Sequence, residues 1–373
     1  MKNSTNPAGS AQNYLFSQHP DRPVLFFDPV ALRASYRRFA DGFPGLVTFA
    51  VKANDSFEVL ENLVVAGMNA FDVASPAEME RVRAVSPDAV LHYNNPIRSR
   101  SEIRRGVEMG VASWSVDCLS ELNKLIEGGA TGEIAVRLRL PVKGAAYDFG
   151  EKFGADPELA VELLREVSRA GFEPAMTFHP GTQCSDPSAW ERYIEECGNI
   201  TVRAGVEIKR LNVGGGYAAH RTGDAPDVEA IFDAIDRQVR KVFGDRLPAL
   251  VCEPGRALVA ESYQLSVRVK AIKQGGLLYL NDGIYGGMTE WRDLGEMDRM
   301  TVLSDDGVVT GEPREFTIFG PTCDSLDRVP NKVSLPEAID EEDYILFAGM
   351  GAYSSATTTA FNGYGDLLRV TLG

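Results

Sequence analysis

Eight short apolar runs, separated by stretches with helical periodicity, constrain the fold of this chain more than any other feature. Each run is nearly continuous in apolar residues, as is typical of strands that are buried on both faces of a sheet. Strands that alternate with helices form parallel sheets, and eight such units predict a (β/α)8 barrel of the TIM type. The runs are residues 46–51, 69–73, 89–93, 111–116, 134–140, 175–178, 209–213 and 249–253.

The sequence changes character after about residue 257, where strand-like segments and turns follow one another. This succession of strands and turns predicts a second domain, a β-sandwich or β-barrel. The run at 24–27 precedes the first helix and has no partner in the predicted barrel, so we expect it to pair within the β domain. The predicted domains are a disordered lead at 1–12, a strand and helix at 13–43 that contribute to the β domain, the α/β barrel at 44–257 and the C-terminal β domain at 258–373.

The charge and composition of the chain argue against several classes of protein. Its 38 basic and 53 acidic residues give a formal net charge of −15, which disfavours general affinity for nucleic acid or anionic membranes. The apolar runs are far shorter than the roughly 20 residues that span a bilayer. The five cysteines form no CxxC pair and no metal spacing, so we expect free thiols and no metal site. The polar amino terminus lacks the apolar segment of a signal peptide, which makes the cytoplasm the expected location.

Residues that directly follow the strands are active-site candidates, because a (β/α)8 barrel carries its chemistry at the carboxyl ends of its strands. Lys52 ends the first run, where partial burial would lower its pKa and suit it to form a Schiff base; a solvated lysine at a strand end is the alternative. The second run supplies Asp72, and Glu78 lies early in the next helix. The fifth run supplies Arg139 near its end. His179 follows the sixth, where a core histidine and a functional one are both compatible with the pattern.

Two motifs after the last strands are typical of an anion site. The Gly214–Gly216 turn follows the seventh run and lets backbone N–H groups approach a phosphate closely, and Arg256 of the EPGR motif can add a bidentate clamp. Barrels often hold phosphate after strands seven and eight. With Lys52 and His179, the carboxylate of Glu253 completes a set that fits pyridoxal phosphate, because an anion beside the protonated ring nitrogen makes the ring an electron sink.

The segment GPTCDSLD, residues 320–327, places a thiol and two carboxylates beside a turn bounded by glycine and proline. Taken alone, Cys323 can be a buried small apolar residue and Asp324 an ordinary turn residue. The segment gains meaning only beside the candidate residues of the barrel.

The chain resembles the ornithine decarboxylase group of fold type III pyridoxal-phosphate enzymes, which pair an alanine-racemase-like barrel with a β domain. The resemblance spans nearly the whole chain, and its motifs occur in the family's order and spacing. It is carried by FAVKAN (49–54), FDVASPAEME (71–80), KFG (152–154), HPGTQC (179–184), NVGGGY (212–217), EPGR (253–256), NDGIYG (281–286), GPTCDSLD (320–327) and GAYSSATTTAFNG (351–363).

The resemblance implies a homodimeric decarboxylase whose active sites combine residues of both subunits. Lys52 would bind the cofactor covalently, His179 would stack on its ring and Glu253 would pair with the ring nitrogen. The partner subunit would supply Cys323 as the acid that protonates Cα, and Asp324 to bind a distal ammonium. Further implied contacts are Asp72, Arg139, Thr182, Gly214, Gly215, Gly216, Gly255, Arg256 and Tyr353 for the cofactor, and Asp293, Tyr285 and Phe361 for the substrate.

The substrate implied by the resemblance is L-ornithine, converted to putrescine in polyamine biosynthesis, or L-lysine, converted to cadaverine. Two departures from the family pattern leave this choice open. Pro180 and Gln183 stand where the family usually has other residues, and the segment after position 285 does not align cleanly with the family's substrate-binding loop. There Asp293 can bind the distal ammonium, Arg292 can bind a substrate carboxylate and Glu290 is another acid; alternatively, all three belong to an exposed charged loop.

Other activities of the same fold remain alternatives. One is decarboxylation of diaminopimelate or of a carboxylated diamine, although diaminopimelate enzymes usually carry Glu in place of Asp324. Arginine decarboxylases share the aspartate but are normally much longer, and alanine racemase lacks the GPTCD segment. A regulatory relative without catalytic activity is disfavoured by the presence of Lys52, Glu253 and Cys323.

Overall fold

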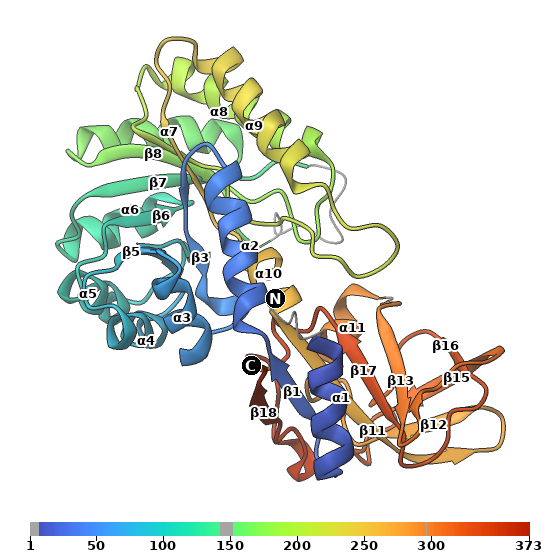
Figure 1. Ribbon diagram of the computed structural model, residues 1–373. Coiled ribbons are helices and arrows are strands. Elements are labelled where there is room, and N and C mark those ends of the chain that lie inside the picture. Colours follow the sequence, from blue (N-terminus) through green and yellow to red (C-terminus); the bar gives the residue numbers. More distant parts are fainter. Residues whose placement is uncertain (1–6, 142–151, 296) are drawn as a thin grey trace, which may run out of the picture. The chain divides into compact units, whose positions relative to one another are not determined.

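The structure is a computed structural model that describes residues 7–141, 152–295 and 297–373 (Figure 1). The chain divides into two compact units. Unit 1 comprises the chain up to residue 35, residues 219–225 and residues 258–373, and unit 2 comprises residues 36–218 and 226–257. Within the described ranges, no helix is both long enough and apolar enough to cross a lipid bilayer.

Unit 2 is a barrel of parallel strands, as predicted. The eight predicted runs all form strands, and Thr48 divides the first one into β2 (Leu46–Val47) and β3 (Phe49–Ala50). β2 pairs with the last barrel strand and β3 pairs with β4, so these two short strands join the two ends of the sheet. The other strands are β4 (Ala70–Val73), β5 (Val90–Tyr93), β6 (Ser113–Val116), β7 (Glu133–Leu138), β8 (Glu173–Phe178), β9 (Arg210–Asn212) and β10 (Ala249–Cys252).

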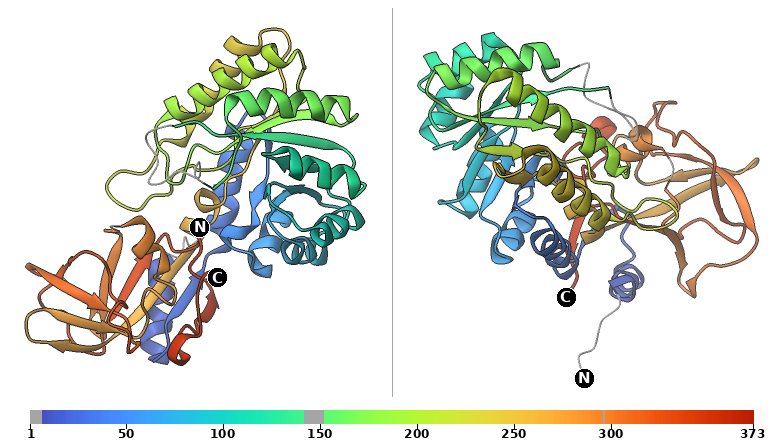
Figure 2. Two further views of the ribbon diagram at one scale, coloured as in Figure 1. Left: turned by 180° about the vertical axis from the view of Figure 1, so that it is seen from behind. Right: turned by 90° about the horizontal axis from the view of Figure 1, so that it is seen from above.

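Helices alternate with these strands and cover the outside of the barrel (Figures 1 and 2). Several begin at a polar residue whose side chain accepts a backbone N–H of the first turn, as Ser75, Ser99, Asp156 and Asp227 do. Such caps end each loop at a fixed residue, and the loops between strand and cap carry the candidate site. The helical segments are η1 (Val51–Ala53), α3 (Phe57–Val65), α4 (Pro76–Val85), α5 (Arg100–Glu108), α6 (Leu119–Glu127), α7 (Pro157–Arg169), α8 (Pro187–Ala204), α9 (Val228–Phe243) and α10 (Arg256–Val259).

Unit 1 is built on a mixed sheet. The early strand β1 (Val24–Phe27) pairs antiparallel with β11 (Tyr263–Lys273) and parallel with β18 (Leu368–Thr371), which confirms that residues 24–27 pair with the C-terminal part of the chain. The remaining strands of the sheet are β12 (Leu277–Leu280), β13 (Met300–Ser304), β14 (Gly307–Val308), β15 (Pro313–Phe319), β16 (Val333–Pro336) and β17 (Tyr344–Ala348). The short helical segments η2 (Ala260–Ser262), α11 (Thr289–Leu294) and η3 (Phe361–Gly363) lie in its connections.

The prediction of a disordered lead at 1–12 is wrong for residues 7–12, which belong to helix α1 (Pro7–Gln18). Ala11 and Leu15 are fully buried in a cluster with Val24, Phe26 and other apolar side chains of the sheet. Because Ala11 and Leu15 are four residues apart, one face of the helix carries both into the core. Most other residues of the segment are polar, so this apolar helix face is not apparent from its composition. Residues 1–6 lie outside the described part of the chain.

The observed units also differ from the predicted boundary at residue 43. The second half of helix α2 (Pro29–Gly42) belongs to unit 2, where the rings of Phe39 and Phe43 pack against the ring of Phe232 at centroid distances of 5.2 and 5.7 Å. Aromatic contacts of this kind, which the local sequence does not reveal, decide to which core the helix belongs.

Candidate functional site

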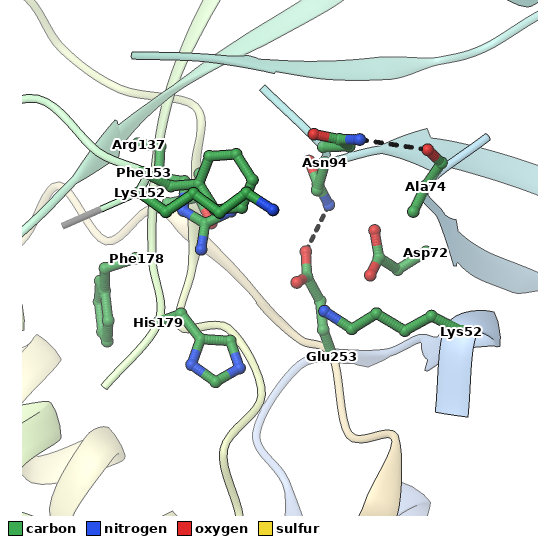
Figure 3. Close-up of a pocket in the computed structure, with 12 residues that line it drawn as sticks. Lys52, Asp72, Ala74, Asn94, Arg137, Lys152, Phe153, Phe178, His179 and Glu253 are labelled. Carbon is green, nitrogen blue, oxygen red and sulfur yellow. Dashed lines mark hydrogen bonds between the residues drawn. The ribbon is translucent and has the colours of Figure 1, made fainter. Parts of the chain in front are cut away.

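A cavity of about 230 Å³ lies at the carboxyl ends of the barrel strands, and residues of unit 2 line it (Figure 3). Four of the predicted site residues meet there although they are far apart in the sequence. They are Lys52, Asp72, His179 and Glu253. Parallel strands present their carboxyl ends at one edge of the sheet, which explains why residues that follow different strands converge. The other lining residues are Ala74, Asn94, Asn95, Arg137, Lys152, Phe153, Thr177 and Phe178.

Lys52 lies in η1, directly after β3, and its side chain points toward the carboxylates of Glu253 and Asp72 (Figure 3). The side chain is exposed, so the partial burial expected from the sequence is not present. The loop that carries Glu253 passes very close to the lysine turn: a Cβ added to Gly255 would lie 3.0 Å from the Cβ of Ala53. Glycine at position 255 therefore allows the lysine and the glutamate to face one cavity.

Glu253 and Asp72 form a pair of buried carboxyl groups at the cavity wall. Burial raises the pKa of Asp72 well above its ordinary value, and the neighbouring Glu253 raises it further. Burial also raises the pKa of Glu253, against which the hydrogen bond from Asn212 and the charges of Lys52 and Arg137 act. Two buried acids thus lie beside the exposed Lys52 and the half-buried Arg137, and a further positively charged N–H group would be well accommodated beside Glu253.

His179 follows β8 and is held as a neutral ring. The backbone N–H of Gly181 donates to its Nδ1 at 3.1 Å, so the ring proton of the neutral form is on Nε2. Burial lowers the pKa of His179 well below its ordinary value, and the positive charges of Lys52 and Arg137 lower it further. A neutral imidazole of fixed orientation can lie against a flat cofactor ring without adding charge to the site.

The glycine turn after β9 packs against the His179 loop and leaves no room for side chains. A Cβ on Gly214 would lie 2.1 Å from the carbonyl oxygen of Phe178, and one on Gly216 would lie 2.2 Å from that of Gly181. Both residues have positive φ angles, 70° and 89°, which glycine adopts without strain. The predicted cofactor-binding residues Thr182, Gly214, Gly215, Gly216 and Gly255 lie in the loops that follow β8, β9 and β10, and Arg256 is the first residue of α10.

Arg137, not Arg139, is the arginine of the cavity, which corrects the sequence prediction. Arg137 is on β7, and its guanidinium lies 4.9 Å from the ring centroid of Phe153, another lining residue. β7 ends at Leu138, and Arg139 is exposed beyond it. In the sequence, both arginines alternate with apolar residues, so only the residue at which the strand ends distinguishes them.

Sequence reasoning missed two asparagines that bind Glu253. The side-chain amides of Asn94 and Asn212 both donate to Oε1 of Glu253. Asn94 is the first residue after β5, and Asn212 is the last residue of β9. A search of every strand end for polar side chains, applied to the third run as well, would have found Asn94.

The GPTCDSLD segment in unit 1 is organised around its second carboxylate. Asp327 is 1% exposed and accepts the backbone N–H groups of Ile284 and Thr322 and the hydroxyl of Thr322, at 3.0, 3.1 and 2.8 Å. A Cβ on Gly320 would lie 2.3 Å from both of its carboxylate oxygens. Asp327 therefore shapes the loop and is not available to a ligand.

The other two reactive groups of this segment are more accessible than Asp327: Cys323 is exposed and Asp324 is half-buried. Cys323 has an exposed side chain, and its backbone N–H donates to Oδ1 of Asn362 at 3.0 Å. The hydroxyl of Tyr285 donates to Oδ2 of Asp324, and this hydrogen bond lowers the pKa of Asp324. Phe361 lies beside the tyrosine, with the two ring centroids 5.1 Å apart. Three of the four predicted substrate residues, Asp324, Tyr285 and Phe361, thus form one group within unit 1.

The fourth, Asp293, is on α11 and is exposed, with its carboxylate 2.7 Å from Nε of Arg292. Glu290, considered as another acid, is buried and faces Arg221 at 3.9 Å, so it does not belong to an exposed loop. Tyr353, predicted to bind phosphate, lies in unit 1 with a positive φ of 61°, an uncommon conformation for a residue with a side chain. Gln183 also has a positive φ, 51°.

Comparison with known proteins gives consistent results. Residues 30–260 match the family described as "Pyridoxal-dependent decarboxylase, pyridoxal binding domain". The chain is 30% identical over 368 residues to Decarboxylase flvG of Aspergillus flavus, which covers 92% of this chain and 84% of the relative. It is 30% identical over 343 residues to the ornithine decarboxylase of Panagrellus redivivus, covering 85% of this chain and 77% of the relative. The lysine/ornithine decarboxylase of Vibrio vulnificus, solved as a complex with cadaverine, has a TM-score of 0.84 at 25% identity, with 97% of each chain covered.

Proposed function

This chain belongs to the family of pyridoxal-dependent decarboxylases, and we propose that it releases CO₂ from L-ornithine to form putrescine, or from L-lysine to form cadaverine. The observation that carries the substrate class is the state of Asp324. Its carboxylate is half-buried, and the hydrogen bond from the hydroxyl of Tyr285 lowers its pKa and so favours the ionised form, as a site for a distal ammonium requires. A relative named as an ornithine decarboxylase supports this choice, which would place the enzyme in polyamine biosynthesis.

The residues of the barrel cavity fit pyridoxal phosphate. Lys52 offers an amine for covalent attachment, Glu253 a carboxylate for the protonated ring nitrogen and His179 a neutral ring for stacking. When bound, pyridoxal phosphate supplies the electron sink for the bond that breaks at Cα. Asp72, Glu78 and Arg137 would support Lys52 and Glu253, with Arg137 taking the place predicted for Arg139. The phosphate would be held by Thr182, Gly214, Gly215, Gly216, Gly255, Arg256 and Tyr353.

We further propose that the protein is a homodimer in which Cys323 and Asp324 of the partner subunit complete each site. The surface near Cys323 supports this: Leu326 and Phe361 are 71% and 43% exposed, an apolar surface that a second copy can cover. Sγ of Cys323 would deliver the proton to Cα after CO₂ has left, and Lys52 would release the amine product.

The pairing of Arg292 with Asp293 favours a second candidate substrate, a carboxylated diamine. Nε and Nη2 of Arg292 lie 2.7 and 3.2 Å from the two oxygens of Asp293. The Asp293 carboxylate already has a cation beside it, which weakens its case as a site for the distal ammonium. A second carboxylate on the substrate would suit Arg292 if it took the place of Asp293 in this pair.

The test is CO₂ release and amine formation by the purified protein with added pyridoxal phosphate, measured on a panel of L- and D-ornithine, lysine, arginine, diaminopimelate and carboxylated diamines. We expect putrescine from L-ornithine or cadaverine from L-lysine, and visible absorbance of the lysine-linked cofactor. The Lys52→Ala variant is the control and should lose both signals. A protein that stays colourless with added cofactor, or that exchanges the α-hydrogen without releasing CO₂, would contradict the proposal.

A further inference from the structure

One oxygen of Glu253 receives two hydrogen bonds from side chains to which the sequence assigned no role. The amides of Asn94 and Asn212 both donate to Oε1 (Figure 3 shows the bond from Asn94). All three side chains are buried: Asn94, Asn212 and Glu253 are 8%, 5% and 9% exposed. In such surroundings each N–H···O bond to a carboxylate contributes more than it would in water.

The two amides determine the protonation and the direction of the carboxylate. Two N–H donors use the acceptor capacity of Oε1, so a proton on this oxygen would displace one of them. They therefore favour the ionised form of Glu253 and act against the burial that raises its pKa. The second oxygen, Oε2, remains to meet a donor in the cavity.

The fold fixes the orientation of the Asn212 amide and the position of the Asn94 backbone. Oδ1 of Asn212 accepts the backbone N–H of Gly214 at 2.9 Å, which turns the NH₂ group of Asn212 toward Glu253. The backbone carbonyl of Asn94 accepts the hydroxyl of Ser115 on the neighbouring strand at 2.8 Å. The loop after Asn94 is closed by Arg98, whose guanidinium donates to the carbonyls of Tyr93 and Ser115.

We propose that Asn94 and Asn212 are positioning residues that keep Glu253 ionised and aim its Oε2 at the ring nitrogen of pyridoxal phosphate. This inference rests on the proposed function, because it assigns a ring nitrogen to the cavity. It adds that the depth of the electron sink depends on two uncharged side chains that act through Glu253 and do not touch the reacting atoms. If the asparagines served only to pack the site, their loss would weaken cofactor binding equally, whichever atom of the cofactor faces Glu253.

The test compares two cofactors on the apo-protein. One is pyridoxal phosphate, and the other is its 1-deaza analogue, in which a C–H group replaces the ring nitrogen. Binding is measured by absorbance and fluorescence titration of the wild type, Asn94→Ala and the isosteric variant Asn94→Asp, with Asn199→Ala as the matched control. Asn199 is on the surface of α8 and also donates its amide to a glutamate, Glu196, at 3.1 Å.

We expect Asn94→Ala to weaken binding of pyridoxal phosphate about tenfold, with little change for the deaza analogue, because only the former has a ring N–H for Glu253. Asn94→Asp should lose more at about pH 8 and recover toward about pH 6, where a protonated Asp can again donate to Glu253. Asn199→Ala should match the wild type. Equal losses for both cofactors, or no loss with either variant, would overturn the inference, whereas a wild type that binds neither cofactor would overturn the proposed function itself.

Discussion

The carboxylates of the barrel cavity and those of the GPTCDSLD segment are held in opposite ways. In unit 2, Glu253 and Asp72 are buried among charged and amide side chains that also belong to the site. In unit 1, the buried Asp327 binds mainly backbone N–H groups and shapes the loop, while Asp324, three residues away, is only half-buried. The barrel cavity uses the same buried residues for structure and chemistry, and the segment divides these tasks between neighbouring residues.

The largest expected effect tests the division of chemistry between the two regions. Lys52→Ala should lose the absorbance of the lysine-linked cofactor and about 10⁴-fold in decarboxylation rate. Cys323→Ala should keep the absorbance and lose about 10²-fold, because the cysteine is expected only to donate a proton. The measurement is absorbance together with CO₂ release, and it includes analysis of misprotonated products. Wild-type product partitioning in Cys323→Ala would remove the cysteine from the acid role.

Mixing the two variants tests whether the regions meet across a dimer. In a heterodimer, one site would combine an intact Lys52 with an intact Cys323, so an equal mixture should recover about a quarter of wild-type activity. Each variant alone, treated in the same way, is the control. A mixture that is no more active than the sum of its parts would show that each site is contained in one chain.

Sequence alone predicted the barrel and four residues of its cavity because a repeated pattern locates strand ends, and strand ends locate active sites. It did not distinguish Arg137 from Arg139, since both alternate with apolar residues and only the paired length of β7 separates them. It missed Asn94 and Asn212 because the role of an uncharged amide depends on the group to which it hydrogen-bonds, which the sequence does not show. It also gave no reason to choose which aspartate of GPTCDSLD is buried, because the donors around Asp327 come partly from a distant segment.

His92, a buried histidine of the barrel, should make unit 2 less stable in acid. His92 on β5 is 1% exposed, and burial together with the charge of Arg210 lowers its pKa to about 3. The unfolded chain, with a histidine pKa near 6.5, binds more protons between about pH 6.5 and about pH 3, so stability is lost as the pH falls through this window, by up to about 5 kcal/mol. His92→Gln, which keeps an acceptor for Arg210, should reduce this loss in urea unfolding followed from about pH 7 to about pH 4.5. Parallel pH profiles for variant and wild type would contradict the prediction.

A buried aspartate of unit 1 should act in the opposite direction. Burial raises the pKa of Asp282 to about 7, although the backbone N–H groups of Gly287 and Gly283 oppose the shift. The folded state therefore binds more protons than the unfolded chain between about pH 4 and about pH 7, and stability falls as the pH rises, by about 4 kcal/mol at most. Asp282→Asn should be more stable than the wild type at about pH 8 and lose this advantage at about pH 4. An advantage that does not change with pH would exclude titration of Asp282 as its cause.

The smallest expected effect separates the two carboxylates of the GPTCDSLD segment. In Asp327→Asn, the amide that replaces one carboxylate oxygen faces donors such as the N–H of Thr322, so we expect the free energy of unfolding to fall by about 2 to 3 kcal/mol. Asp324→Asn keeps an oxygen for the backbone N–H of Leu326, which Oδ1 of Asp324 accepts at 2.9 Å, and loses only the part-buried hydrogen bond from Tyr285. It should change stability by less than about 0.5 kcal/mol while it lowers kcat/KM for a diamino acid. Denaturant unfolding and steady-state kinetics on both variants provide the measurement. If the two substitutions destabilise the protein equally, Asp324 also supports the loop, and the separation of structure from chemistry in unit 1 does not hold.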